Sequence, residues 1–207
     1  MTHPGRLRTF LVALLAYVGG VASPGAAWAQ ETPNQNVYTV EVVVFRNMSG
    51  GGGVEDWSAK PVPRGPDKPD SAFTGRFIQT IPAAQFQLND VAAKLQNSSN
   101  YQPIAHFAWQ QTASSWGSRA GFTVAKLAGS VPGLTGTIYL ESGTYLHLGM
   151  ALGYQSSNPP AGLGADPGTV FNMAESRRVI PFKPTYFDHP AFGVVALVTR
   201  NKAGGGR

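Results

Sequence analysis

The segment from Val37 to Phe45, with the sequence VYTVEVVVF, constrains the fold of this chain more than any other. It is rich in β-branched residues, which favour strands, and it is apolar on both faces apart from Thr39 and Glu41. Strands that are apolar on both faces usually lie in the middle of a sheet, with each face covered. The segment therefore predicts a central strand, in which Glu41 is either a polar residue at the rim of the sheet or a functional residue.

One helix and a second strand are expected to follow this segment. The stretch 84–97 predicts a helix, because apolar residues recur there at the spacing of one helical face. The residues of this apolar stripe are Leu88, Val91, Ala92 and Leu95. The stretch 101–111 alternates like a strand and places Tyr101 on the same face as Phe107 and Trp109. Strand, helix and strand in this order suggest a split β-α-β start, as in ferredoxin-like sheets.

A hairpin is expected in the second half of the chain. A short strand is predicted over 121–127, followed by a hairpin with arms at 136–141 and 145–154. In the second arm, apolar residues alternate with other residue types, as in a half-buried strand. This alternation places Tyr145 and His147 on an accessible face of the sheet.

Two further extended segments, 169–180 and 192–199, are expected to complete the domain. The second is apolar on both faces and is interpreted as scaffold. The chain contains 25 glycines and 16 prolines, which indicates long loops, here at 48–70 and 155–168. The expected fold class is α+β: a single domain over 30–202, mainly antiparallel β-sheet, with a split β-α-β (ferredoxin-like) start and long Gly/Pro loops.

The N-terminal segment 1–29 has the pattern of a cleaved secretory signal peptide. Two arginines precede a mostly apolar run at 10–22, and a small-x-small cleavage site ends at Ala29. The run has thirteen residues, whereas a membrane-spanning helix needs about 20. An uncleaved anchor is the alternative. No later apolar stretch is long enough to span a bilayer, and residues 203–207 are expected to form a disordered tail.

Composition and charge argue against several classes of function. The absence of cysteine excludes disulfides, thiolate metal sites and a cysteine nucleophile, and it suits an oxidising compartment such as the periplasm. Removing the signal peptide takes away two of the sixteen basic residues and none of the eleven acidic ones, which leaves a net charge of +3. The basic residues are scattered along the chain, so nucleic acid is not an expected partner.

No cofactor and no catalytic residue are expected. The chain has no Gly-x-Ser-x-Gly elbow, and no two histidines share a metal-binding spacing. The alternative that stays open is a metal-dependent envelope hydrolase, in which three histidines and a carboxylate would meet. Its ligands would be His106, His147 and His189, with Asp188 or Glu41.

Several segments in order along the chain resemble the CsiV-like peptidoglycan-binding family of proteobacterial periplasmic proteins. They are the signal peptide, VYTVEVVVF, YQPIAHFAWQQ after a helix, YLHLGMALGY, and a closing ESRRV…YFDHPAFGVVALVT. The paired arginines followed by Tyr-x-Asp-His-Pro-x-x-Gly are the most specific part. The resemblance implies peptidoglycan binding in the periplasm and a role in cell-wall assembly and cell shape. It also implies activation of a penicillin-binding synthase through its outer-membrane lipoprotein partner.

Two departures from the family pattern concern the expected ligand or partner. An arginine usually precedes the Tyr-Leu-His segment, and Thr144 stands there. The usual Glu-Leu-His/Asn-Tyr after the arginine pair is replaced by Lys183-Pro184-Thr185-Tyr186. If these positions touch the ligand or partner, its identity differs from that of the family.

The candidate ligand-binding residues follow from the chemistry of peptidoglycan, which presents sugar rings, carboxylates and amides. An arginine fork matches a carboxylate, and an aromatic ring can stack on a sugar. Arg177 and Arg178 are consecutive on an expected strand, so they point to opposite faces and at most one serves a given surface. The candidates are Arg177, Arg178, Tyr186, Asp188, His189, Tyr145 and His147.

Each candidate also has a structural interpretation. The arginines could form ordinary ion pairs, and Tyr186 could belong to the core. Asp188-His189-Pro190 could be a turn that sets the register of the last strand, because aspartate and the residue before proline both favour turns. A protein-interaction module of the envelope that touches no glycan is a further alternative for the whole domain.

Overall fold

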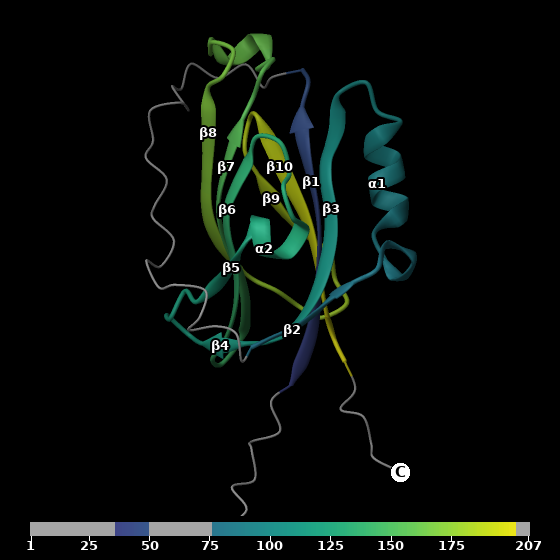
Figure 1. Ribbon diagram of the computed structural model, residues 1–207, viewed down its shortest axis with the longest axis vertical. Coiled ribbons are helices and arrows are strands. Elements are labelled where there is room, and N and C mark those ends of the chain that lie inside the picture. Colours follow the sequence, from purple (N-terminus) through teal and green to yellow (C-terminus); the bar gives the residue numbers. More distant parts are fainter. Residues whose placement is uncertain (1–35, 50–75, 202–207) are drawn as a thin grey trace, which may run out of the picture. The chain divides into compact units, whose positions relative to one another are not determined.

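Two β-sheets that share one core make up the part of the chain that the structure describes (Figure 1). This computed structural model describes residues 36–49 and 76–201, all within the unit Asn34–Arg207. The expected signal segment, the tail and most of the loop 48–70 therefore lie outside the described residues.

The first sheet has the order β2-β3-β1-β10-β9, with the N-terminal strand at its centre. Its strands are β1 Val37–Asn47, β2 Phe77–Ile81, β3 Tyr101–Thr112, β9 Thr185–Asp188 and β10 Phe192–Arg200. Strand β1 pairs antiparallel with both β3 and β10, which confirms the prediction of a central strand. Strand β10 is buried along most of its length, as expected for scaffold.

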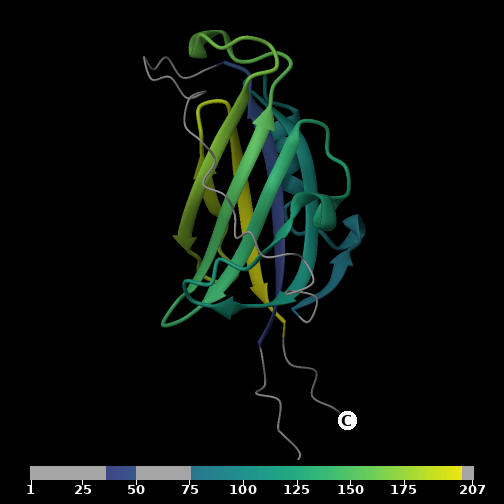
Figure 2. The same cartoon turned by 60° about the vertical axis from the view of Figure 1, so that its left-hand side comes forward.

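The second sheet has the order β4-β6-β7-β8, and β5 also pairs with β6. Its strands are β4 Ser114–Ser115, β5 Gly121–Thr123, β6 Leu134–Ser142, β7 Leu146–Gln155 and β8 Val170–Arg178. Strands β6 and β7 form the predicted hairpin. In Figure 2, β6, β7 and β8 lie in front of the strands of the first sheet.

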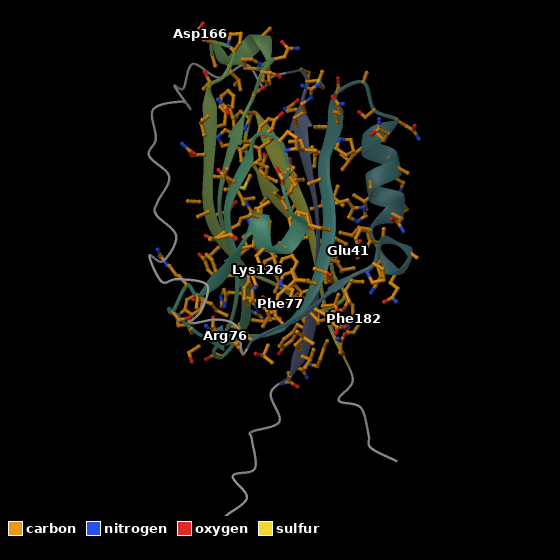
Figure 3. The ribbon with its side chains drawn as sticks, viewed as in Figure 1. Glu41, Arg76, Phe77, Lys126, Asp166 and Phe182 are labelled. Carbon is orange, nitrogen blue, oxygen red and sulfur yellow. The ribbon has the colours of Figure 1, made fainter. Side chains whose placement is uncertain are left out.

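The strand predicted over 121–127 is shorter than expected. Only β5 is extended, because the Thr123 hydroxyl accepts a hydrogen bond from the Lys126 amide and so caps a short helix, α2, at Val124–Ala128. The Lys126 ammonium lies 5.1 Å from the centre of the Phe77 ring. Figure 3 labels these two residues close together. This contact links α2 to strand β2.

The inner faces of the two sheets pack together and form the main core. The first sheet contributes residues such as Val42 and Trp109, and the second contributes residues such as Ile138 and Leu148. Burial of each such side chain stabilises the fold by about 1.5–3 kcal/mol. The indole N–H of Trp109 donates to Gln111 Oε1 at 2.8 Å, so this buried polar atom is satisfied.

Helix α1, Asn89–Gln96, covers part of the outer face of the first sheet (Figure 1). The predicted helix 84–97 is α-helical only in this part and is preceded by a 3-10 turn, η2, at Ala83–Gln85. The predicted apolar stripe packs on Val43, Val195 and Leu197 in a small cluster separate from the main core.

Glu41 anchors the start of α1. Its carboxylate accepts hydrogen bonds from the backbone N–H groups of Gln87 and Leu88 and lies against His106 Nε2, each at 2.8 Å. Figure 3 labels it near the end of α1 at which the helix begins. These three bonds account for the burial of a carboxylate in the sheet. Glu41 is therefore a buried structural residue whose carboxylate is satisfied by hydrogen bonds.

A bulge in β3 changes which face Tyr101 occupies. Ala105 pairs with Val44, but Pro103 pairs with Phe45, so Ile104 is an extra residue. Phe107 and Trp109 face the core as predicted, whereas Tyr101 contacts Phe45 on the outer face. The prediction that Tyr101 shares their face is wrong, because one extra residue reverses the alternation.

The mainly antiparallel sheet structure with few helices is consistent with the expected α+β class. The split β-α-β start is not confirmed. Strands β1 and β3 are direct neighbours and antiparallel, whereas a β-α-β unit joins parallel strands. The loop expected at 155–168 includes a 3-10 turn, η3, at Ala161–Leu163.

A search of the described residues for a helix both long and apolar enough to cross a membrane found no such helix.

Candidate ligand-binding surfaces

The two consecutive arginines of β8 point to opposite faces of the second sheet. Arg178 is paired with His147 and Arg177 with Leu148 on the neighbouring strand β7. Directly paired residues share a face of an antiparallel sheet. Because Leu148 belongs to the main core, Arg177 lies on the inner face and Arg178 on the outer face. The predicted separation of the two arginines is confirmed.

On the outer face, Arg178 belongs to a group of four planar side chains, here called the Arg178 cluster: Trp116, Tyr145, His147 and Arg178. The guanidinium carbon of Arg178 lies 3.6 Å from the centre of the Tyr145 ring. The rings of Trp116 and His147 lie 4.1 Å apart at 46°. Trp116 is 57 % exposed and Tyr145 is 48 % exposed, so the cluster presents flat groups to solvent.

The electrostatics of the Arg178 cluster favour an anion. No carboxylate of the described residues forms an ion pair with Arg178. An acidic residue, Glu141, is the pairing partner of His147 on the next strand. Glu141 is buried, and its carboxylate already accepts the backbone N–H of Arg119. Among the described residues, the Arg178 guanidinium thus lies against the Tyr145 ring and has no carboxylate as an ion-pair partner.

Arg177 has partners of its own. Its Nε donates to Glu175 Oε1 at 2.6 Å, and its guanidinium lies 5.6 Å from the ring of Phe187 on β9. The contact with Phe187 connects β8, the edge strand of the second sheet, to β9, the edge strand of the first. This arrangement matches the structural interpretation of an ion-paired arginine.

Tyr186 and Asp188 lie on the other sheet. Together with Phe45 and Tyr101 they form a group here called the tyrosine shelf. The Tyr186 ring stacks on Phe45 with centroids 6.1 Å apart at 10°, and the Tyr101 ring meets Phe45 edge-on at 5.3 Å. The Tyr186 hydroxyl donates to Asp188 Oδ1 at 2.7 Å. Burial, followed by the hydrogen bond to Asp188 and its charge, raises the pKa of Tyr186 above its usual value.

His189 lies in the interior, only 5 % exposed. Its Nδ1 accepts the backbone N–H of Ala191 at 3.1 Å, and its ring packs near Phe171 and Phe192. The turn it belongs to joins β9 to β10 and pairs Asp188 with Gly193. This geometry matches the turn interpretation of Asp-His-Pro and keeps the His189 ring away from the two exposed surfaces.

The three histidines of the hydrolase alternative lie in different places. His106 contacts Glu41 beneath α1, His147 belongs to the Arg178 cluster and His189 is in the interior. Within the described ranges, no three histidine, aspartate or glutamate side chains come close enough to hold a metal ion together. The described residues thus offer no common site for that alternative.

Three residues of these surfaces are absent from the sequence-based candidates: the buried Phe45 and the exposed Trp116 and Tyr101. Trp116 follows the short strand β4 in the serine- and glycine-rich stretch SSWGS, where a large aromatic residue is a signal of exposure or binding. Tyr101 was assigned to the core-facing side of its strand, and no sequence pattern revealed the bulge.

A comparison of the chain with models of protein families finds a match to the family described as "Peptidoglycan-binding protein, CsiV". The match covers residues 10–201, which is nearly the whole chain. No curated protein and no solved structure matches the chain.

Both departures from the family pattern lie next to the two surfaces. Thr144 directly precedes Tyr145 in the turn between β6 and β7. Lys183 and Pro184 lie between β8 and β9, one or two residues before the strand that carries Tyr186.

Proposed function

The chain belongs to the CsiV family of peptidoglycan-binding proteins, and from this premise we propose that it binds peptidoglycan through the Arg178 cluster. The bound group is a carboxylate of the polymer, held by the guanidinium fork of Arg178. The exposed rings of Trp116 and Tyr145 pack against the adjoining sugar or peptide.

The observation that supports this assignment most directly is that the Arg178 guanidinium is stacked on an aromatic ring but has no ion-pair partner in the described part of the chain. Its guanidinium is stacked on Tyr145 at 3.6 Å and forms no ion pair with any described residue. Arginine binds carboxylates through two parallel hydrogen bonds, and a guanidinium that is already held in plane loses less side-chain freedom on binding. The neighbouring Arg177 is ion-paired with Glu175 and does not meet these conditions.

The proposal also covers the location of the protein and its role in the cell. The signal-peptide pattern of residues 1–29 supports export to the periplasm. The family resemblance supports a non-catalytic role in cell-wall assembly and cell shape, through a penicillin-binding synthase and its outer-membrane activator.

Co-sedimentation with purified sacculi tests the proposal. We expect the exported protein to sediment with sacculi and Arg178→Ala to reduce the bound fraction strongly. One charge-assisted hydrogen-bonded contact contributes about 1.5–3 kcal/mol, or roughly ten- to a hundredfold in affinity. Arg178→Lys keeps the charge but loses the fork, so it should bind at an intermediate level.

Arg177→Ala is the matched control, because it removes the same charge from the adjacent residue. It should leave sedimentation nearly unchanged. Equal losses for the two variants would point to a general charge effect and contradict a specific site at Arg178. Failure of the parent protein to sediment, together with capture of the synthase complex in the absence of glycan, would favour the interaction module.

A further inference from the structure

The tyrosine shelf occupies the part of the first sheet that α1 leaves uncovered. The cluster under α1 includes Val43 on β1, and Phe45 lies two residues further along the same face. Tyr101 is 38 % exposed and Tyr186 is 43 % exposed, whereas Phe45 is buried beneath them. An aromatic surface thus remains open beside the helix.

Gly193 makes this surface flat. Phe45 is paired with Gly193 on the neighbouring strand. A Cβ atom at Gly193 would lie 2.6 Å from Phe45 Cζ and 3.1 Å from Tyr186 Cε2. These distances are shorter than normal contacts, so only glycine lets both rings lie close to the backbone of β10.

The exposed rings are also fixed in position. The Tyr186 ring is held by the stack on Phe45 and by the hydrogen bond from its hydroxyl to Asp188. The Tyr101 ring is held edge-on against Phe45. A surface whose side chains are already ordered loses little conformational entropy when a ligand binds. One carboxylate oxygen of Asp188 accepts the hydrogen bond from Tyr186, and the second oxygen can accept another hydrogen bond.

From these observations we propose that the tyrosine shelf is a second binding site, which takes an uncharged pyranose ring of a glycan. The C–H face of the sugar packs on the exposed tyrosine rings, and its hydroxyl groups donate to Asp188. The carboxylate of Asp188 disfavours an anionic ligand, so the chemistry of this site differs from that of the Arg178 cluster. That the glycan is peptidoglycan rests on the proposed function, whereas binding of the sugar ring does not.

The probe is N,N′,N″-triacetylchitotriose, which carries sugar rings but no carboxylate, peptide or ammonium group. In a titration followed by ¹H–¹⁵N NMR, we expect the largest shifts at Tyr101 and at residues 185–188. Tyr186→Ala should weaken binding about tenfold, the size of one lost aromatic contact. Tyr186→Phe keeps the ring and should remain within about twofold of the parent, because stacking contributes more than the hydroxyl.

Lys94→Ala, which removes a charge from an exposed position on α1, is the control and should leave chitotriose binding unchanged. If Tyr186→Ala fails to fold, Tyr101→Ala tests the same surface. The proposal is overturned if the parent protein does not bind the sugar, if the shifts map to the Arg178 cluster, or if Tyr186→Ala binds as well as the parent. None of these results changes the outcome expected for Arg178→Ala in the sacculus experiment, so each proposal can be contradicted without the other.

Discussion

At the scale of single residues, Tyr186 provides a prediction that depends on pH. Its pKa is raised in the folded chain by burial first and by Asp188 second, above the value near 10 expected for an unfolded tyrosine. The unfolded chain therefore loses this proton first as the pH rises. The contribution of Tyr186 to stability is complete below about pH 10 and is lost as the pH rises above that value.

Asp188→Asn should bring the pKa of Tyr186 part of the way back, because the variant removes the charge while the burial remains. The measurement is a spectrophotometric titration of tyrosinate absorbance, with Tyr186→Phe used to identify the contribution of this residue. An unchanged titration in Asp188→Asn would mean that the hydrogen bond to Asp188 has no influence on the phenol.

The limits of sequence reasoning are also visible in single residues. The opposite orientations of Arg177 and Arg178 follow from strand geometry and were predictable. The same alternation places Glu175 on the face of Arg177, so their ion pair was also open to prediction. The contact of Arg177 with Phe187 was not, because Phe187 belongs to the other sheet. Trp116 meets His147 only because β4 and β7 both pair with β6, which brings residues distant in the chain together.

At the scale of elements, α1 is expected to open more easily than the sheets. Its apolar stripe packs in a small separate cluster, and none of its own residues is fully buried. Few buried contacts give a low local unfolding free energy. In hydrogen exchange measured by mass spectrometry, the amides of α1 should exchange faster than those of β1 and β10.

Leu88→Ala sharpens this prediction, because Leu88 is the buried residue that begins the stripe. Loss of such a side chain costs about 2–5 kcal/mol. The variant should accelerate exchange in α1 much more than in β1. A uniform acceleration across both sheets would show instead that the helix and the sheets unfold as one unit.

Elements differ in how well the sequence predicts them. Strand β1 was predictable from its run of β-branched apolar residues, and the stripe of α1 from its helical spacing. The bulge at Ile104 was not, since a strand with one extra residue has no distinct composition. Strand β9 was not predicted, because it has only four residues and follows a proline.

At the scale of the whole molecule, the two proposed surfaces belong to different sheets whose inner faces share the core. Both surfaces lie on outer faces, so they point away from each other. One domain could then hold two glycan segments at once, and the second contact would be strengthened by the first. We expect the protein to join soluble peptidoglycan fragments into larger particles, as measured by light scattering.

Arg178→Ala and Tyr186→Ala should each abolish this increase in particle size, because bridging needs both surfaces. Arg177→Ala should preserve it. Particle growth that persists in either single variant would mean that one surface is sufficient and that the domain does not bridge.

The pairing of β1 with β10 also determines when this molecule can fold. The central strand begins at Val37, its neighbour ends at Arg200, and the Asn201 amide donates to the Val37 carbonyl oxygen at 2.9 Å. The middle of the first sheet therefore cannot close until Arg200 has been synthesised. A nascent chain lacking β10 has β1 without one of its two partners, and contacts between segments so distant in sequence form slowly. The export proposed above would benefit from this delay, because a chain that has not yet folded can pass through a translocation channel.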